Sequence, residues 1–451
     1  MADEVWVVGG GLAGAEAAWQ IARAGLDVAV FEMRPQRETG AHRTADLAEL
    51  VCSNSLGSKL PDRASGVLLN ELRALGSLLV RSAEATSVPA GGALAVDRVA
   101  FSGEVTRALE DHPRVRIVRQ EVREIPDGIG VLASGPLTSP ALAASLEGLT
   151  GQDNLYFFDA LSPIVEAETI DLSIAFRASR YRRGEDEGGD YLNCPMSPDE
   201  YGSFVEALVK AERIPLREFE TPIESGVRAG AGRYFEGCLP IEVIASRGSE
   251  SLAFGPLRPV GLIDPRTGRR PHAVVQLRRD NLAGSLYNLV GFQTNLTYPE
   301  QKRVFQLIPG LAGARFARYG QMHRNTFVNA PEVILPSLEV RTRPGLFLAG
   351  QLTGVEGYLG NIATGLLAGL NAARRSREEP AVVLPPETML GALCRYVSES
   401  PPSEFQPMKA NFGILPPLEG APVRDRRRRN EGHAERSRVS LARAIERSQC
   451  A

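Results

Sequence analysis

The sequence predicts an α/β fold, with a discontinuous Rossmann-type domain and a smaller α+β insertion domain. Three observations predict it: a glycine-rich strand–turn–helix opens the chain, a similar apolar strand and helix return in the last third, and a stretch rich in Gly, Pro and Arg separates them. A chain of 451 residues also exceeds what one simple core requires. We expect residues 1–195 and 300–445 to form the Rossmann-type domain, 196–299 the insertion domain and 424–451 a basic tail.

The opening segment has the pattern of a dinucleotide-binding βαβ unit. An apolar strand at residues 5–8 leads into glycines, a helix is expected over 15–24, and a second strand over 27–31 ends at Glu32. In this pattern Gly9 permits the tight turn, Gly11 lets the backbone approach a pyrophosphate, and Gly14 lets helix and strand pack closely. Glu32 can accept hydrogen bonds from ribose hydroxyls. The predicted cofactor-binding residues here are Gly9, Gly10, Gly11, Leu12, Ala13, Gly14 and Glu32.

Later segments extend the same domain. Helical spacing is expected over 67–85 and 96–109, and strands over 115–118 and 130–133. In the insertion we expect a helix over 199–211 and a strand over 273–277. The strand 345–351 ends at Gly350 and Gln351 and precedes a helix over 362–375. In flavoproteins with two dinucleotide-binding segments, a late strand of this kind contacts the flavin; the alternative is one more buried strand and helix.

Composition narrows the class of protein. The formal net charge of −3 excludes bulk attraction to polyanions, so a nucleic-acid surface has to be a local patch. No apolar run has the length of a membrane span and no signal peptide precedes the first strand, which predicts a cytoplasmic protein. The arginine-dense tail either contacts phosphates or is a solvated or disordered end.

Two of the five cysteines have surroundings that suit a reactive thiol. None of the five has metal-ligand spacing, so the sequence predicts no metal site, and an odd number disfavours a disulfide framework. Cys52 lies in a polar turn, and Cys238 lies in a loop between a glycine and a proline. Each is either a small buried hydrophobe or a nucleophile. His323, between polar neighbours, is either structural or part of a site.

These motifs resemble one known family over nearly the whole chain, the folate- and flavin-dependent tRNA uracil-5-methyltransferases (TrmFO), within the flavin-dependent tRNA-modifying superfamily. The two cysteine motifs together are its most specific features. The resemblance rests on segments 9–14, 31–35, 49–56, 234–242, 255–262, 290–294, 322–326, 350–358 and 405–413.

The resemblance implies a reaction and a set of cofactors. It implies FAD, NAD(P)H as reductant and methylenetetrahydrofolate as carbon donor, with uridine 54 in the T arm of tRNA converted to 5-methyluridine. Thiolate addition at uracil C6 would make C5 nucleophilic. By the match, Cys238 is the nucleophile and Cys52 the general base or the protector of the activated flavin, although these roles could be exchanged.

Further residues receive roles from the same match. Arg34 joins Glu32 in cofactor binding. His323 and Tyr358 are candidates for stacking on folate or on the target base. No obligate protein partner is implied. Arginines that could position tRNA phosphates are Arg258, Arg266, Arg269, Arg270 and Arg278.

One departure and three alternatives accompany this interpretation. Leu359-Gly360-Asn361 replaces the acidic residue and serine that the family usually has, and Asn361 can still cap a helix. The first alternative is the related family that modifies the wobble uridine, which usually carries a longer helical C-terminal region. The second is a simple NAD(P)H:flavin oxidoreductase, and the third is a non-catalytic tRNA chaperone. Folate-dependent formation of methyluridine distinguishes the uracil-5-methyltransferase interpretation from all three alternatives.

Overall fold

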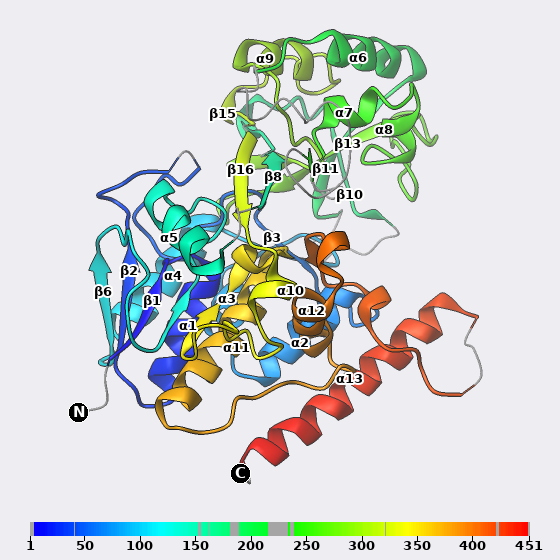
Figure 1. Cartoon of the computed structure of the whole chain (residues 1–451). Coiled ribbons are helices and arrows are strands. Elements are labelled where there is room, and N and C mark those ends of the chain that lie inside the picture. The colour runs from blue at the N-terminus through cyan, green and yellow to red at the C-terminus, as the bar shows by residue number, and fades with distance from the viewer. Residues whose placement is uncertain are drawn as a thin grey trace.

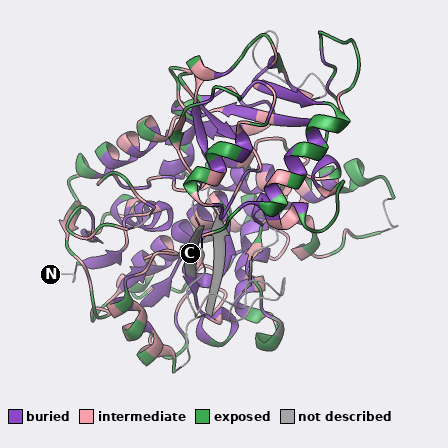
Figure 2. Ribbon diagram, turned by 90° about the horizontal axis from the view of Figure 1, so that it is seen from above, coloured by how far each residue is buried: buried purple, intermediate pink, exposed green. Residues whose placement is uncertain are grey.

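The chain folds into two lobes, which Figure 1 shows one above the other. The structure is a computed structural model that describes residues 4–39, 41–151, 155–160, 162–180, 189–214, 233–234, 239–320, 322–420 and 424–449. The lower lobe contains the N-terminal strands, and the upper lobe contains most of the chain between residues 162 and 320. Buried segments gather inside each lobe and exposed helix faces lie outside them (Figure 2).

A parallel sheet of Rossmann type organises the lower lobe, as predicted. Its strand order is β17-β7-β1-β2-β6, and every neighbouring pair is parallel. All four residues of the first strand are buried, which explains its unbroken apolar sequence. The strands are β1 (Val5–Val8), β2 (Val28–Glu32), β6 (Val115–Arg119), β7 (Gly130–Leu132) and β17 (Leu346–Leu348).

Two long helices pack side by side in this lobe. Helix α1 (Leu12–Arg23) and helix α11 (Tyr358–Ser376) run in the same direction. Gly365 faces Ala13, and one turn later Gly369 faces Ala17. A Cβ on Gly365 would lie 2.2 Å from the Ala13 carbonyl oxygen, so the close approach requires glycine there. The two helix N-termini therefore meet at the same edge of the sheet.

One segment with helical spacing contains two helices. Helical apolar spacing runs over 67–85, but the structure has two helices there, α2 (Ala64–Ala74) and α3 (Leu78–Ala85), separated by a turn. Gly76 has φ +76° there, and the Ser77 hydroxyl accepts a hydrogen bond from the Val80 N–H at 3.2 Å, which caps the second helix. Other elements of this lobe are α4 (Arg98–Glu110), α5 (Pro140–Thr150), α10 (Ala330–Val333), α12 (Met389–Glu399), β3 (Ser55–Ser58), β4 (Ser87–Val88), β5 (Ala93–Val96), β18 (Val355–Glu356) and β19 (Met408–Lys409).

The upper lobe is built on a second, antiparallel sheet. Its strand order is β10-β11-β13-β14-β9-β15. The sheet extends from Ile164 to Arg318 and its core from Val165 to Ala314, beyond the expected limits of 196–299 on both sides. The elements are β9 (Ile164–Glu166), β10 (Phe176–Ala178), β11 (Tyr191–Met196), β13 (Ala273–Arg279), β14 (Leu286–Leu289), β15 (Phe316–Arg318), α6 (Pro198–Lys210), α7 (Ile241–Ala245), α8 (Ser251–Phe254) and α9 (Tyr298–Phe305).

A ribbon of two antiparallel strands runs between the lobes. Strands β8 (Leu155–Ala160) and β16 (Met322–Phe327) pair along their whole length, and β12 (Arg233–Tyr234) joins β8 in parallel. Figure 1 shows β8 and β16 leading from the upper sheet down to the lower lobe. The chain thus enters and leaves the upper lobe close to the same place.

The basic tail is a helix. Helix α13 (Arg426–Gln449) packs against α2, so this segment is not a disordered end. Asn430 donates a hydrogen bond to the Asp62 carbonyl oxygen at 3.1 Å, and Leu441 is 3% exposed. None of the helices in the described ranges is long and apolar enough to cross a membrane.

Candidate functional site

A pocket opens at the carboxyl ends of the parallel strands, where nucleotide sites of this fold lie. The glycine-rich turn after β1 forms its floor. Gly9 has φ +103°, and a Cβ on Gly14 would lie 1.8 Å from the Gly9 carbonyl oxygen. Both glycines therefore serve close backbone packing. A Cβ on Gly11 would meet nothing within 4 Å, so this glycine instead leaves open the space in front of α1.

Glu32 closes the pocket at the end of β2 and is already well bonded. Its Oε2 accepts from the Gly10 N–H at 2.9 Å, and its Oε1 accepts from the backbone N–H and the Nε–H of Arg34, each at 2.9 Å. Burial opposes ionisation of this carboxyl, but the Arg34 bonds and charge hold its pKa below the ordinary value. A carboxylate accepts about four hydrogen bonds, so Glu32 retains capacity for a ribose hydroxyl.

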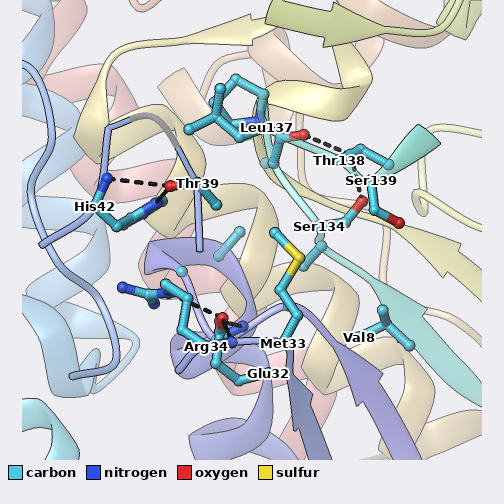
Figure 3. Close-up of a pocket in the computed structure, with 18 of the residues that line it drawn as sticks. Val8, Glu32, Met33, Arg34, Thr39, His42, Ser134, Leu137, Thr138 and Ser139 are labelled. Atoms are coloured by element: carbon cyan, nitrogen blue, oxygen red, sulfur yellow. Dashed lines mark hydrogen bonds and ion pairs between the residues drawn. The ribbon is translucent and has the colours of Figure 1, made fainter. Parts of the chain in front are cut away.

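Figure 3 shows the polar walls of this pocket. Glu32, Met33 and Arg34 lie on one side, and residues 134–139, which follow β7, lie on another. Arg34 is anchored from behind, since its Nη1 donates to the Thr44 carbonyl oxygen and to Glu49, each at 3.1 Å. These walls of the pocket therefore come from two strand ends.

The late strand reaches the same pocket. Gly350 follows β17 with φ +75°, and a Cβ there would lie 2.9 Å from the Ala13 Cβ. Gln351 also lines the pocket and donates to Glu356 at 3.0 Å. Asn361 does not cap α11, because Gly357 occupies the N-cap position and Asn361 lies inside the first turn. Its buried Oδ1 has no hydrogen-bond partner among the residues that the structure describes.

The turn that contains Cys52 lies beside this pocket and is hydrogen-bonded to Tyr358. The Tyr358 hydroxyl oxygen accepts from the N–H of Cys52 at 2.8 Å and from the N–H of Ser53 at 3.1 Å. Tyr358 is the first residue of α11 and also lines the pocket. Burial raises the pKa of its phenol, which keeps the hydroxyl neutral at physiological pH. Tyr358 thus couples the Cys52 backbone to the nucleotide pocket.

Arginines from two elements, α4 and β15, hold the carbonyl side of the same turn. Arg98 at the start of α4 donates to the carbonyl oxygens of Leu50 at 2.8 Å and of Cys52 at 3.1 Å. Arg318 in β15 donates to the Val51 carbonyl oxygen at 2.5 Å. Burial lowers the pKa of Arg318 to about 10, which still leaves it charged at neutral pH.

Arg278 holds the other side of the turn. From β13 it donates to Asn54 Oδ1 at 2.8 Å and to Ser53 Oγ at 2.7 Å. It is 7% exposed, and burial lowers its pKa below the ordinary value. Arg278, Arg98 and Arg318 all interact electrostatically with the Cys52 sulfur. Cys52 therefore lies among three guanidinium groups.

The grouping of these three arginines around Cys52 depends on contact between the lobes. Arg98 belongs to the lower lobe and forms an ion pair with Asp280, just after β13, at 3.1 Å. Their side chains are 11% and 4% exposed. Burial works against the charge of Arg98, but the adjacent Asp280 carboxylate raises its pKa above the ordinary value. This pair, together with the Arg278 bonds, joins the lobes next to Cys52.

The other predicted site residues do not gather at this pocket in the part of the chain that the structure describes. Cys238 lies outside the described residues. For His323 the structure describes only the backbone, in β16 opposite Asp159. Arg258, Arg269 and Arg270 are exposed on the upper lobe, and Arg266 is paired with Asp264 at 2.8 Å.

Sequence reasoning missed Arg98, Arg318 and Asp280. Each lies far from Cys52 in sequence, and no local motif marks any of them. The sequence indicates Arg278 as one of several arginines that could position phosphates, but in the structure it is buried and binds Ser53 and Asn54. Its position at the end of a buried strand was the one available sign that its side chain faces the protein.

Comparisons with known proteins agree with this architecture. The family model described as "Glucose inhibited division protein A" (GIDA) matches residues 4–380. Two relatives, from Heliobacterium modesticaldum and Desulforudis audaxviator, are each 56% identical, over 440 and 443 residues. The alignments cover 97% and 98% of this chain and the same shares of the relatives. Both relatives are called methylenetetrahydrofolate--tRNA-(uracil-5-)-methyltransferase TrmFO.

A solved structure is similar in fold. GidA of Aquifex aeolicus superposes with a TM-score of 0.67 at 16% identity, over 98% of this chain and 76% of that one. At that identity the likeness bears on the fold alone. The near full-length identity to the relatives goes further and confirms the resemblance seen in the motifs: the chain belongs to the TrmFO family of the flavin-dependent tRNA-modifying superfamily.

Proposed function

We propose that this protein is an FAD-dependent enzyme that methylates C5 of a uridine in tRNA with methylenetetrahydrofolate as carbon donor. The observation that carries the proposal is the placement of Cys52. Its turn is bonded to Tyr358 at the mouth of a dinucleotide pocket and surrounded by three arginines. Relatives 56% identical over nearly the full chain carry the name of this activity.

The residues of the pocket fit FAD. Gly11 leaves open the space that a pyrophosphate needs, and the first N–H groups of α1 lie behind it. Glu32 retains lone pairs for the adenosine ribose. On the other side, the N-terminus of α11 and the unpartnered Asn361 Oδ1 offer polar groups to an isoalloxazine ring. FAD, when bound, supplies the redox chemistry that turns a transferred methylene into a methyl group.

The protein's own groups then have to activate the uracil. C5 of uracil is a poor nucleophile until a thiolate adds to C6 and places negative charge at C5. We assign this addition to Cys238, and removal of the C5 proton to Cys52. Cations beside a cysteine favour its thiolate, the form that a general base requires. The bonds from Tyr358 and the arginines fix the Cys52 backbone, and with it the direction of the Cα–Cβ bond.

Three finer features belong to the same proposal. The target is uridine 54 in the T arm, NAD(P)H is the reductant, and the reaction takes place in the cytoplasm. His323 and Tyr358 are the proposed contacts to folate or the target base. The exposed Arg258 is a proposed phosphate contact, whereas Arg278 acts in our proposal on the Cys52 turn instead.

Mass spectrometry of nucleosides tests the proposal. An unmodified tRNA transcript is incubated with the purified protein, FAD, NAD(P)H and methylenetetrahydrofolate, and a parallel reaction omits the folate. Folate-dependent 5-methyluridine is the expected result, and a transcript with uridine 54 replaced by cytidine remains unmethylated. A yellow protein that oxidises NAD(P)H but forms no methyluridine would instead be a simple flavin oxidoreductase.

A further inference from the structure

The first turn of α13 carries an unusual concentration of exposed positive charge. Residues 424–449 contain nine arginines and four acidic residues, a formal charge of +5 in a chain whose total is −3. The run 426–429 consists of four successive arginines, all exposed. At 100° per residue, four successive residues point to all sides of a helix. The tip of α13 is therefore cationic around its whole circumference.

This arrangement is unfavourable for the free protein. The N-terminus of a helix carries the positive end of its dipole, so acidic residues stabilise it and cations destabilise it. Helix α13 has no acidic residue in its first turn, and the carboxylate of Asp425, just before the helix, accepts a hydrogen bond from the backbone N–H of Arg428 at 2.7 Å. Only Arg427 of the run has an ion pair among the described residues, with Glu431 at 2.9 Å. The guanidinium groups of Arg426, Arg428 and Arg429 have no described carboxylate partner. Conflicts of this kind between local and overall stability are typical of functional positions.

The rest of α13 fixes where the cationic tip lies. Asn430 is bonded to Asp62 on the loop before α2, and the Ser437 hydroxyl donates to the buried carboxylate of Glu71 in α2. Farther along, Leu441 and Ile445 pack into the hydrophobic core of the lower lobe. Figure 1 shows α13 at the margin of this lobe, with its first turn at the outer edge. The tip is thus held in place by the helix behind it.

The chemistry of the tip selects its partner. A helix that binds a membrane surface needs an apolar face for the lipid, but the apolar face of α13 is buried against the protein. Guanidinium groups without partners, spread around a helix tip, suit a chain of phosphates that passes several of them at once. Arginines that contact phosphates position a nucleic acid without reading its sequence.

We propose that the first turn of α13, through Arg426, Arg428 and Arg429, binds the phosphate backbone of tRNA outside the reaction site. The proposal rests on the proposed function, because tRNA is the polyanion that such an enzyme handles. Its role is to position tRNA, so its loss weakens binding and leaves the flavin pocket intact.

A salt titration of tRNA binding tests this proposal. The variant Arg426→Gln/Arg428→Gln/Arg429→Gln and the unchanged protein, both with FAD bound, are titrated with labelled, unmodified tRNA transcript at several salt concentrations. Each lost phosphate contact lowers the slope of log K against log salt by about 0.7–0.9, so we expect a decrease of roughly 2–3. The Kd should rise about tenfold or more near 0.1 M salt.

A charge-matched variant separates local contacts from overall charge. Arg107→Gln/Arg114→Gln/Arg116→Gln removes three exposed arginines around α4 and β6 that already have acidic partners. It should bind tRNA like the unchanged protein. Equal weakening in both variants, or an unchanged Kd and slope in the α13 variant, overturns the proposal.

Two further outcomes are distinguishable. If the unchanged protein does not bind tRNA at all, the proposed function fails together with this inference. If the α13 variant loses binding to phosphatidylserine vesicles while its tRNA affinity is unchanged, the tip binds lipid and the inference is wrong. Flavin content and far-UV circular dichroism, expected to be the same in all three proteins, show that the fold is intact.

Discussion

Substitution of Gly11 by valine separates cofactor binding from folding. Gly11 is the N-cap of α1, with φ −73° and ψ −168°, a conformation that any residue adopts. Its Cβ would meet nothing within 4 Å. The apoprotein should therefore lose no more than about 1 kcal/mol, since valine is only a poorer N-cap than glycine. For a chain of this length, that corresponds to a decrease in Tm of about 2 °C or less.

The effect on FAD should be much larger. The valine side chain would occupy the space through which a pyrophosphate reaches the N–H groups of α1. Loss of one or two hydrogen bonds to a charged group costs about 1.5–3 kcal/mol each. A total of about 3–4 kcal/mol corresponds to a Kd for FAD that is roughly 10²- to 10³-fold higher.

Fluorescence titration of apoprotein with FAD measures this change, and differential scanning calorimetry measures the stability. Gly14→Ala is the informative comparison, because its Cβ would lie 1.8 Å from the Gly9 carbonyl oxygen. That variant should be strongly destabilised even without FAD. A Gly11→Val protein that binds FAD with unchanged affinity would refute the assignment of this turn to the pyrophosphate.

Three further predictions follow from the site. Cys238→Ala should keep the bound flavin, as measured by absorbance, but form no 5-methyluridine; retained turnover would remove the nucleophile assignment. Asp280→Asn leaves Arg98 buried without its carboxylate and should cost about 3–5 kcal/mol in denaturant unfolding, and a loss below 1 kcal/mol would contradict this. The lowered pKa of Glu32 means that its ionised form stabilises the apoprotein above pH 4.5, and that this contribution is lost as pH falls through and below that value. Glu32→Gln should therefore destabilise the apoprotein more at pH 7 than at pH 3.5, and an equal difference at both would refute the linkage.

Local sequence was sufficient to predict the N-terminal nucleotide-binding unit. The role expected of Gly14 depends on Gly9, five positions away, so the spacing of glycines predicts it, whereas Gly9 is itself packed against Ala133, which follows the distant strand β7. The division of 67–85 into two helices was also encoded locally, by Gly76 and Ser77, but the apolar spacing continues across the turn and hides it. Periodicity reports which face is buried, and it does not report a change in helix direction.

The limits of the upper lobe could not be predicted in the same way. Strands β9, β10 and β15 have three residues each, too few for a periodic pattern, and they join the sheet only through partners far along the chain. The buried position of Arg278 could not be predicted from local sequence for the same reason. Its partners Ser53 and Asn54 are more than 220 residues away, and only the packing of the two lobes brings them together.

The surroundings of Cys52 explain why both lobes matter for its chemistry. Residues 49–56 contain no basic side chain, so the sequence around the thiol offers no cation to it. The cations come from α4 in one lobe and from β13 and β15 in the other. The same guanidinium groups also bind the carbonyls and side chains of the turn, so they fix its geometry while they supply the charge. All three arginines surround the Cys52 thiol only when the two lobes are in contact. The buried Arg98–Asp280 ion pair holds the lobes together at this place. We therefore expect the reactivity of Cys52 to report on the contact between the lobes as well as on the groups beside it.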